Sequence, residues 1–253
     1  MKEFKTSFCV LVLSTIHPDY KIFEDSIRLT YGKKLTENNV KYFFYKGGAK
    51  KSNIINDVIN LNCNDQLSDT FLKFKMATEL LLRNYPGVKL IFRTNLSSYL
   101  DVNNLIKYIK INNLGLDSYD GISGSANKIS EYFYGNRIFH LLFKKLNFGS
   151  SINFYSGSGF FLGINNFNKL KERKQYFIDD VEIGFQLRPV KKASKYSRIL
   201  IDNNFRPLKE SKYKFMLNNH LFHYKFKTSN RALDAKLLLS FDELDFRNKI
   251  IIE

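Results

Sequence analysis

The feature that most constrains the fold is an uninterrupted apolar run near the start of the chain. The run FCVLVLST (Phe8–Thr15) is rich in β-branched residues and ends in two hydroxyl side chains. A strand with one solvated face would alternate apolar and polar residues, so a continuous run predicts a strand that is buried on both faces of a parallel sheet. Because parallel strands are joined by crossover connections, which are usually helices, we expect an α/β protein.

Apolar periodicity in the rest of the first half continues this alternation. Helical spacing is clearest over Asp69–Asn84, where a broad apolar face ends at Tyr85-Pro86-Gly87. The other expected elements are strands at Val40–Tyr45, Ile54–Leu61 and Val88–Asn95, and helices at Lys21–Tyr31 and Leu100–Ile111. Strands that alternate with helices predict βαβ units, with binding at the carboxyl edge of the sheet.

The second half of the chain is less regular. We expect strands at Tyr119–Gly124, Ile152–Tyr155, Gly159–Gly163 and Leu221–Phe226, and helices at Phe167–Gln175, Ile183–Leu187 and Ser229–Leu239. No internal repeat or low-complexity linker divides the 253 residues. A single α/β domain is therefore expected, with a mixed, mostly parallel central sheet that is flanked by helices.

The charge balance points to anionic partners. Lysine and arginine number 40 against 24 acidic residues, a net charge of +16, which leaves nucleic acid, a membrane surface and a phosphorylated small molecule open. No stretch of eighteen apolar residues predicts a membrane span. The two cysteines, Cys9 and Cys63, are too few for a disulfide framework, so a cytoplasmic, reducing compartment is expected.

Two local patterns are candidates for chemistry. The segment YFIDDVEIG places Asp179 and Asp180 ahead of a predicted helix, where acids either cap the helix or serve as a general base. The segment SGSGFFLG (Ser156–Gly163) contains two glycines among serines. Such a segment predicts either a tight turn between strands or a backbone that a ligand approaches closely.

Phosphate-loop and metal-site patterns are absent from the sequence. Gly47-Gly48 with its neighbouring lysines is interpreted as a solvated loop, because no G-x-x-x-x-G-K-[ST] or G-x-G-x-x-G pattern occurs. His220 and His223 flank one predicted strand at an odd spacing, so they face opposite sides and do not readily share a metal ion.

Taken together, four segments in order resemble the fringe and β1,3-galactosyltransferase family. IRLTYG (Ile27–Gly32) resembles its I-R-x-T-W-G, and Asn64–Asn95 resembles a long stretch that ends in a strand reading K-T-D-D-D. YSGSGFFLG resembles S-G-x-G-Y-x-L-S, DDVEIG resembles E-D-V-x-x-G, and HYKFK is like a late histidine segment of related folds. The likeness spans roughly residues 8–187 and implies a Rossmann-like GT-A domain. It further implies an inverting transfer of a sugar from a nucleotide sugar, with UDP as the family expectation, to an acceptor hydroxyl of a glycan or glycoconjugate.

The resemblance also implies a site. Asp180 matches the general base, and Asp179 replaces the usual glutamate. Residues matched to donor binding are Ser14, Thr15, Ile16, Arg28, Arg93, Thr94, Asn95 and Ser97, and those matched to acceptor binding are Tyr155, Gly157, Ser158 and Gly159. The corresponding division of the domain is residues 1–115 for the nucleotide sugar, 116–230 for the acceptor, and 231–253 for a C-terminal helix and tail.

One departure concerns the metal ion. The acidic triad of the family corresponds here to Asn95, Leu96 and Ser97, which are poor ligands for Mn²⁺ or Mg²⁺. No metal ligand set is predicted, and His223 would be the remaining ligand if a metal binds. Charge on the leaving diphosphate still needs stabilisation, for which the basic side chains Arg28, Arg93, Lys225 and Lys227 are candidates.

Two other functions remain open from the sequence. The missing acidic triad is compatible with an inactive protein of the same fold that binds a sugar nucleotide or glycan. The charge, with 24 Phe and 15 Tyr, is compatible with a nucleic-acid binder, whose affinity would fall steeply with salt. The scattered basic residues and the lack of a recognised motif disfavour nucleic acid. Luminal members of the family carry a membrane anchor and several cysteines, so we expect a soluble bacterial or viral protein instead.

Overall fold

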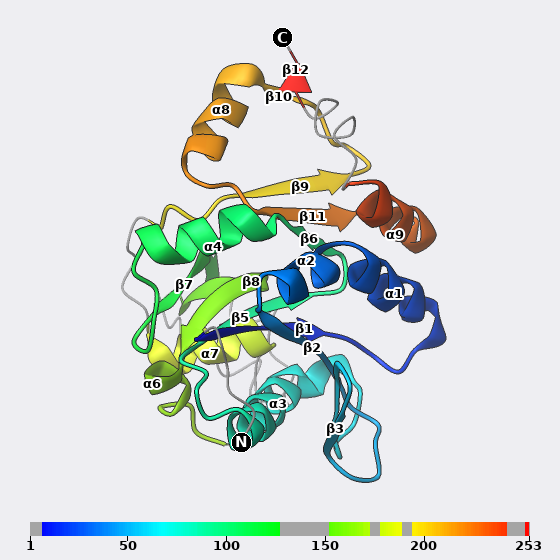
Figure 1. Cartoon of the computed structure of the whole chain (residues 1–253), viewed down its shortest axis with the longest axis vertical. Coiled ribbons are helices and arrows are strands. Elements are labelled where there is room, and N and C mark those ends of the chain that lie inside the picture. Colours follow the sequence, from blue (N-terminus) through cyan, green and yellow to red (C-terminus); the bar gives the residue numbers. More distant parts are fainter. Residues whose placement is uncertain (1–6, 127–151, 173–177, 189–193, 242–250, 253) are drawn as a thin grey trace, which may run out of the picture.

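The fold is built around a central sheet, seen edge-on in the middle of Figure 1. The computed structural model describes residues 7–126, 152–172, 178–188, 194–241 and 251–252. Within these ranges a seven-stranded sheet has the order β3-β4-β2-β1-β5-β8-β7. Its strands are β1 (Phe8–Leu13), β2 (Lys41–Lys46), β3 (Asn53–Ile55), β4 (Val58–Asn60), β5 (Leu90–Asn95), β7 (Tyr119–Ala126) and β8 (Ile152–Gly163). Neighbours among β4, β2, β1 and β5 are parallel, whereas β3 and β8 run antiparallel to theirs. The predicted mixed, mostly parallel α/β sheet is confirmed.

Strand β1 lies at the centre of the sheet and is covered on both faces, as its sequence predicts. Val10 and Val12 belong to one apolar cluster, with side chains from α1 (Lys21–Leu29), α2 (Tyr31–Glu37) and α4 (Val102–Ile111). Cys9 and Leu11 belong to the other, with α3 (Thr70–Asn84) and α7 (Asp179–Leu187). Each fully buried aliphatic side chain of this kind contributes about 1.5–3 kcal/mol, so the two clusters fix which face each helix covers.

A small second sheet extends the first and carries part of the candidate site. Its order is β6-β11-β9, with β6 (Ser98–Leu100), β11 (His223–Lys227) and β9 (Arg198–Asp202). Strand β6 follows directly after β5, and β11 pairs with it antiparallel so that Lys225 lies opposite Ser98. Long-range pairing therefore brings a segment near the C-terminus to the carboxyl end of the central sheet.

The remaining elements lie around this framework. Helix α9 (Arg231–Ser240) packs against α1, which ties this late helix to the N-terminal half of the chain. Farther out, at the top of Figure 1, lie β10 (Leu208–Lys209), α8 (Glu210–Asn218) and β12 (Ile251–Ile252), and two single turns are η1 (Pro18–Tyr20) and η2 (Leu67–Asp69). Over the described ranges, no helix has the length and apolar character that crossing a bilayer requires.

The predicted helix at Phe167–Gln175 is wrong over its described part. Helix α6 covers Ile164–Phe167 and is followed by a turn and irregular chain through residue 172, while residues 173–177 lie outside the described ranges. The backbone N–H of Lys171 donates to Gln186 Oε1 at 2.8 Å. Contact with α7 therefore replaces the helical hydrogen bond that the local sequence favours.

Several predicted boundaries are also corrected. The single strand expected at Ile54–Leu61 is a hairpin of β3 and β4, because Asn56 adopts φ 53° and turns the chain. The two strands expected on either side of Ser156–Ser158 form one continuous strand, β8, so the glycines do not make a turn. The helix expected from Ile183 begins at Asp179. His220 precedes β11, with φ 56°, instead of flanking it as a strand residue.

Candidate functional site

A pocket opens where two central strands end. It has a volume of about 460 Å³ and is lined by Leu13, Ser14, Thr15, His17, Tyr20, Phe23, Asp65, Leu67, Thr70, Lys73, Asn95, Leu96, Ser97, Lys225 and Arg231. Leu13 ends β1 and Asn95 ends the neighbouring strand β5. From β1 the chain passes to β2 on one side, and β5 lies on the other. The pocket thus lies at a topological switch point, the place where open α/β sheets bind ligands.

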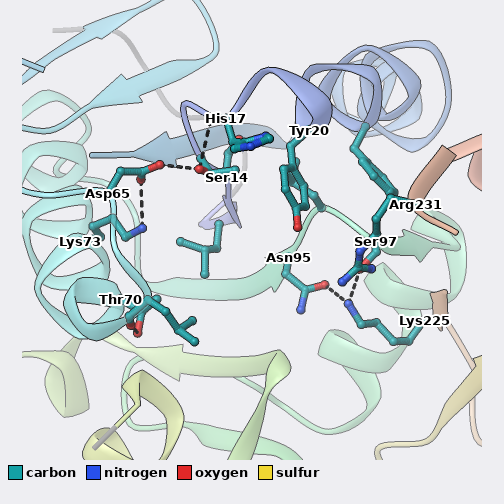
Figure 2. A pocket seen from close by; sticks show the side chains of 15 residues that line it. Ser14, His17, Tyr20, Asp65, Thr70, Lys73, Asn95, Ser97, Lys225 and Arg231 are labelled. Carbon is teal, nitrogen blue, oxygen red and sulfur yellow. Dashed lines mark hydrogen bonds and ion pairs between the residues drawn. The ribbon is translucent and has the colours of Figure 1, made fainter. Parts of the chain in front are cut away.

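One side of the pocket is organised by Asp65 (Figure 2). Its Oδ2 accepts hydrogen bonds from the hydroxyl of Thr15 and from the backbone N–H of Ile16 at 2.8 Å. Its Oδ1 accepts from the N–H of Gly47 at 2.9 Å and from Lys73 Nζ at 3.0 Å. Burial favours the neutral acid, but these four donors outweigh it and hold the pKa of Asp65 below its usual value. One carboxylate therefore joins the loops after β1 and β2 to helix α3.

The opposite side of the pocket presents the cation Lys225 (Figure 2). Its Nζ donates to Asn95 Oδ1 at 2.6 Å and to Ser97 Oγ at 2.5 Å. Burial lowers the pKa of Lys225 to about 7, and the positive charges of Arg231, Arg198 and Arg93 act in the same direction. Next to it, Arg231 Nη1 contacts Asp234 Oδ2 at 3.0 Å. This side is a concentration of positive charge at the end of β5.

The acidic pair lies beyond the pocket, where α7 begins beside β8. Asp179 forms an ion pair with Arg93 in which both side chains are buried. Asp180 Oδ2 accepts the backbone N–H of Gly157 at 2.7 Å, and its Oδ1 accepts that of Val181 at 2.9 Å. Burial and the negative charge of Asp179 raise the pKa of Asp180 to about 6, against the lowering effect of Gly157 N–H and Arg93. The two carboxyls therefore differ, since Asp179 is neutralised by an arginine and Asp180 is held by neutral donors.

The glycines of β8 allow close approach to these groups. A Cβ on Gly157 would lie 2.9 Å from Arg93 Nη1 and 3.2 Å from Asp180 Oδ2, and a Cβ on Gly159 would lie 2.4 Å from Tyr196 Oη. Between them, Ser158 is buried and its hydroxyl accepts a hydrogen bond from Arg198. Only glycine leaves room for these side chains of the protein itself, and the approach of a ligand to this backbone stays a prediction.

The sequence-derived donor residues separate into two groups. Ser14, Thr15, Asn95 and Ser97 line the pocket, whereas Ile16, Arg28, Arg93 and Thr94 do not. Arg93 lies at the acidic pair, and Thr94 Oγ1 donates to the carbonyl of Ser158 at 2.7 Å.

The guanidinium of Arg28 is occupied within the fold. It contacts Asp57 at 2.7 Å and Asp25 at 2.9 Å and lies over the ring of Phe44, with 4.8 Å between its Cζ and the ring centroid. Arg28 also reaches Glu24, whose Oε1 accepts from Ser14 Oγ at 2.6 Å. Arg28 therefore anchors α1 and supports the pocket through Ser14 without lining it.

Tyr155, the first of the four residues matched to the acceptor, does not line the pocket at the ends of β1 and β5. It lines a second pocket of about 390 Å³ on the β7 side of the sheet, together with Tyr119, Asp120 and Ser194. Its ring packs against Tyr119 with 4.7 Å between centroids. The other three matched residues, Gly157, Ser158 and Gly159, line neither of these two pockets.

A divalent metal ion does not fit the residues at the end of β5. His223 is fully buried, with its Nδ1 2.7 Å from Tyr196 Oη and its Nε2 3.0 Å from Ser98 Oγ, so both ring nitrogens are engaged within the fold. Burial keeps the pKa of His223 well below its usual value. The oxygens of Asn95 and Ser97 accept from an ammonium group. In the described part of the chain, no three His, Cys, Asp or Glu residues are placed to hold a metal ion.

Sequence reasoning missed Asp65, Lys73 and Arg231 as pocket residues. Asp65 and Lys73 both fall inside the stretch Asn64–Asn95 that carries the family resemblance, which was the available signal. Arg231 carries no local signal, because only the pairing of β11 with β6 and the packing of α9 bring it to the pocket.

Comparison with known proteins gives a structural likeness alone. No protein-family model matches the chain, and no curated protein matches it. Among solved structures, it is similar to a glycosyltransferase involved in the glycosylation of the major capsid of PBCV-1. The two share 7% sequence identity with a TM-score of 0.46, over 91% of this chain and 98% of that chain.

Proposed function

We propose that the protein is an inverting glycosyltransferase that transfers a sugar from a nucleotide sugar to an acceptor hydroxyl. The observation that carries this proposal is the pocket at the switch point between β1 and β5, with a carboxylate pair at the next strand, β8. Cations at the pocket suit a diphosphate, and a carboxylate outside it suits an acceptor that enters from the β8 side. The sequence resemblance to a family with this reaction supports the same conclusion.

The nucleotide sugar would lie across the pocket, from the side that Asp65 organises to the side where Lys225 lies. The rings of His17 and Tyr20, which contact edge-on with 5.9 Å between centroids, offer apolar surface beside the loop that Asp65 holds. Basic groups at the end of β5 would face the diphosphate, as argued below. In this arrangement the nucleoside occupies the β1 side and the sugar points toward β8. A UDP-sugar is the donor that the family resemblance favours.

Asp180 would act as the general base. As the acceptor oxygen attacks the anomeric carbon, its proton passes to the Asp180 carboxylate, and the bond from that carbon to the diphosphate oxygen breaks with its electron pair. Attack on the face opposite the leaving group inverts the configuration. Asp179 is the weaker candidate because its charge is already compensated by Arg93. A pKa of about 6 for Asp180 is suited to a base that must take up and release a proton near neutrality.

The experiment is a donor panel. The purified protein is mixed with common UDP-, GDP- and CMP-sugars, and thermal stabilisation and release of free nucleotide are measured. One donor class should raise the melting temperature and release nucleotide when an acceptor glycan is supplied. Stabilisation by a donor without transfer to any acceptor would favour the inactive binding protein, for which the absent acidic triad is the supporting observation.

A matched pair of variants ties the panel to the pocket. Asp65→Asn removes the charge that joins the two loops and α3, so donor affinity should fall about tenfold, the effect of losing one charge-assisted hydrogen-bond network. Asp202→Asn makes the same change outside the pocket and should leave donor affinity unaltered. Equal donor affinity for wild type and Asp65→Asn would place the donor elsewhere.

A further inference from the structure

We propose that the ammonium group of Lys225, and not a divalent metal ion, is the cation that receives the diphosphate of the donor. The inference rests on the proposed function for the identity of the ligand, and on the geometry at the end of β5 for the cation. It differs from the resemblance, which implies a metal ion bound at the positions of Asn95–Ser97.

The position of Lys225 is fixed by backbone pairing. Strand β11 pairs with β6 so that Lys225 faces Ser98, and the N–H of Phe226 donates to the carbonyl of Ser97 at 2.9 Å. The side chain then reaches the oxygens of Asn95 and Ser97 at 2.6 and 2.5 Å. The Lys225 ammonium group is therefore held at the end of β5 by two neutral acceptors, and its backbone is fixed by the pairing of β11 with β6.

An ammonium group has three N–H donors. Within the described residues, two of them meet Asn95 Oδ1 and Ser97 Oγ, and Lys225 also lines the pocket. One N–H group of Lys225 thus remains for a ligand, and Figure 2 shows the Nζ at the pocket's edge between those two residues. Such a group is a ready partner for a phosphate oxygen.

Charge compensation singles out Lys225 among the cations of the pocket. Lys73 contacts the carboxylate of Asp65 at 3.0 Å, and Arg231 contacts that of Asp234 at 3.0 Å. The acceptors of Lys225 are an amide and a hydroxyl oxygen, which carry no charge. Among the described residues, Lys225 is therefore the pocket cation without a carboxylate in contact. A bound anion would favour its protonated form, and the nearby guanidinium of Arg231 strengthens the local positive potential.

The same arrangement disfavours a divalent ion. A metal ion bound to the oxygens of Asn95 and Ser97 would lie next to the ammonium group that already contacts them, with like charges in a largely buried place. The groups that could ligate a metal ion here are an amide oxygen and a hydroxyl, which bind Mn²⁺ and Mg²⁺ less strongly than carboxylates do.

The role of Lys225 in the transfer follows from where charge develops. When the bond between the anomeric carbon and the diphosphate oxygen breaks, the electron pair stays on that oxygen and the diphosphate gains one negative charge. The proton of the acceptor goes to Asp180, and a new bond joins the acceptor oxygen to the anomeric carbon. An N–H donor already in place at the diphosphate stabilises this charge more strongly in the transition state than in the bound donor.

The test measures binding of inorganic pyrophosphate and of UDP by calorimetry, in EDTA and separately in Mn²⁺. Wild type should bind both probes in EDTA, with little gain from Mn²⁺. Lys225→Met should weaken both about 10- to 100-fold, the effect of losing one hydrogen bond to a charged group, and Lys225→Arg should retain part of the affinity. Lys212→Met, which removes an exposed lysine of α8 outside the pocket, should bind as wild type does.

Each outcome separates this inference from the proposed function. The cation role of Lys225 would be overturned if wild type requires Mn²⁺ for binding, or if Lys225→Met and wild type bind with equal affinity. The comparison of wild type in EDTA and in Mn²⁺ remains a test even if the variant fails to fold. Lys225-dependent binding of pyrophosphate without binding of UDP would keep the cation site and argue against a uridine nucleotide as donor. Failure of wild type to bind either probe, with or without Mn²⁺, refutes the inference, while transfer from another nucleotide sugar in the donor panel would leave the proposed function standing.

Discussion

Removing Arg93 should show how much its buried ion pair with Asp179 contributes to the free energy of unfolding. Its side chain and that of Asp179 are only 3% and 8% exposed, and its Nε also donates to Tyr45 Oη at 3.2 Å. Arg93→Met keeps most of the apolar length of the side chain but leaves Asp179 buried beside Asp180 without a counter-charge. Breaking one partner of a buried pair costs about 3–5 kcal/mol, a large share of the roughly 5–15 kcal/mol that stabilises a domain.

The free energy of unfolding can be measured by urea denaturation followed by far-ultraviolet circular dichroism, which suits a chain without tryptophan. The double variant Arg93→Met, Asp179→Asn removes both charges and should recover most of the lost stability, because neutral replacements of a buried pair are often tolerated. Arg206→Met, on the exposed surface, should change stability by less than about 0.5 kcal/mol.

Two results would refute this reasoning. The first is a loss below about 1 kcal/mol for Arg93→Met, the size of an average substitution, since it would mean that the pair is not energetically coupled. The second is a double variant no more stable than the single one, since the cost would then come from lost packing of Arg93 and not from the uncompensated charge of Asp179.

Two further predictions concern Asp180 and β8. The pKa of Asp180 is raised to about 6, which means that ionisation of Asp180 destabilises the folded state. Asp180→Asn should therefore be more stable than wild type at pH 8, and this gain in stability should shrink as the pH falls from 6 towards 4. A gain that does not depend on pH in urea titrations would contradict this. Gly159→Ala should lower the free energy of unfolding by about 1–3 kcal/mol, because its Cβ meets Tyr196 Oη at 2.4 Å. Gly115→Ala, whose Cβ meets nothing within 4 Å, is the control, and equal losses in the two variants would remove the steric argument.

Elements with a strong local pattern were predictable from the sequence. The apolar run at β1 needs burial on both faces whatever surrounds it, and it is buried on both. Helix α3 has a periodic apolar face and a Tyr-Pro-Gly stop, and its observed range, Thr70–Asn84, agrees with the predicted one. In both cases local periodicity and tertiary packing favour the same structure.

Elements were mispredicted where a distant contact outweighs local preference. The segment after Phe167 is helical in its periodicity, but Lys171 bonds to Gln186 on α7. In β8 the serines and glycines of residues 156–159 resemble a turn, yet the strand continues. Its backbone pairs with β5 from Gly159 to Gly163, and its glycines make room for Asp180 and Tyr196. Neither partner is visible in a local window of the sequence.

The candidate site was predictable only in part for the same reason. Ser14 and Asn95 end strands whose order could be inferred, so their common edge follows from the α/β pattern. Lys225 reaches Asn95 across 130 positions through the pairing of β11 with β6. Its charge was noted in the sequence, but its contact with the two residues that stand in the acidic triad could come only from the structure.

The most direct test of the central claim is a comparison of sugar transfer and donor binding in wild type and Asp180→Asn, with the donor and acceptor found in the panel. Asp180→Asn keeps the size of the side chain and removes the base. The proposal predicts that donor affinity is unchanged, that transfer is lost by a factor of about 10² or more, and that the wild-type product has the inverted anomeric configuration. Transfer by Asp180→Asn at the wild-type rate, or a product with retained configuration, would contradict it.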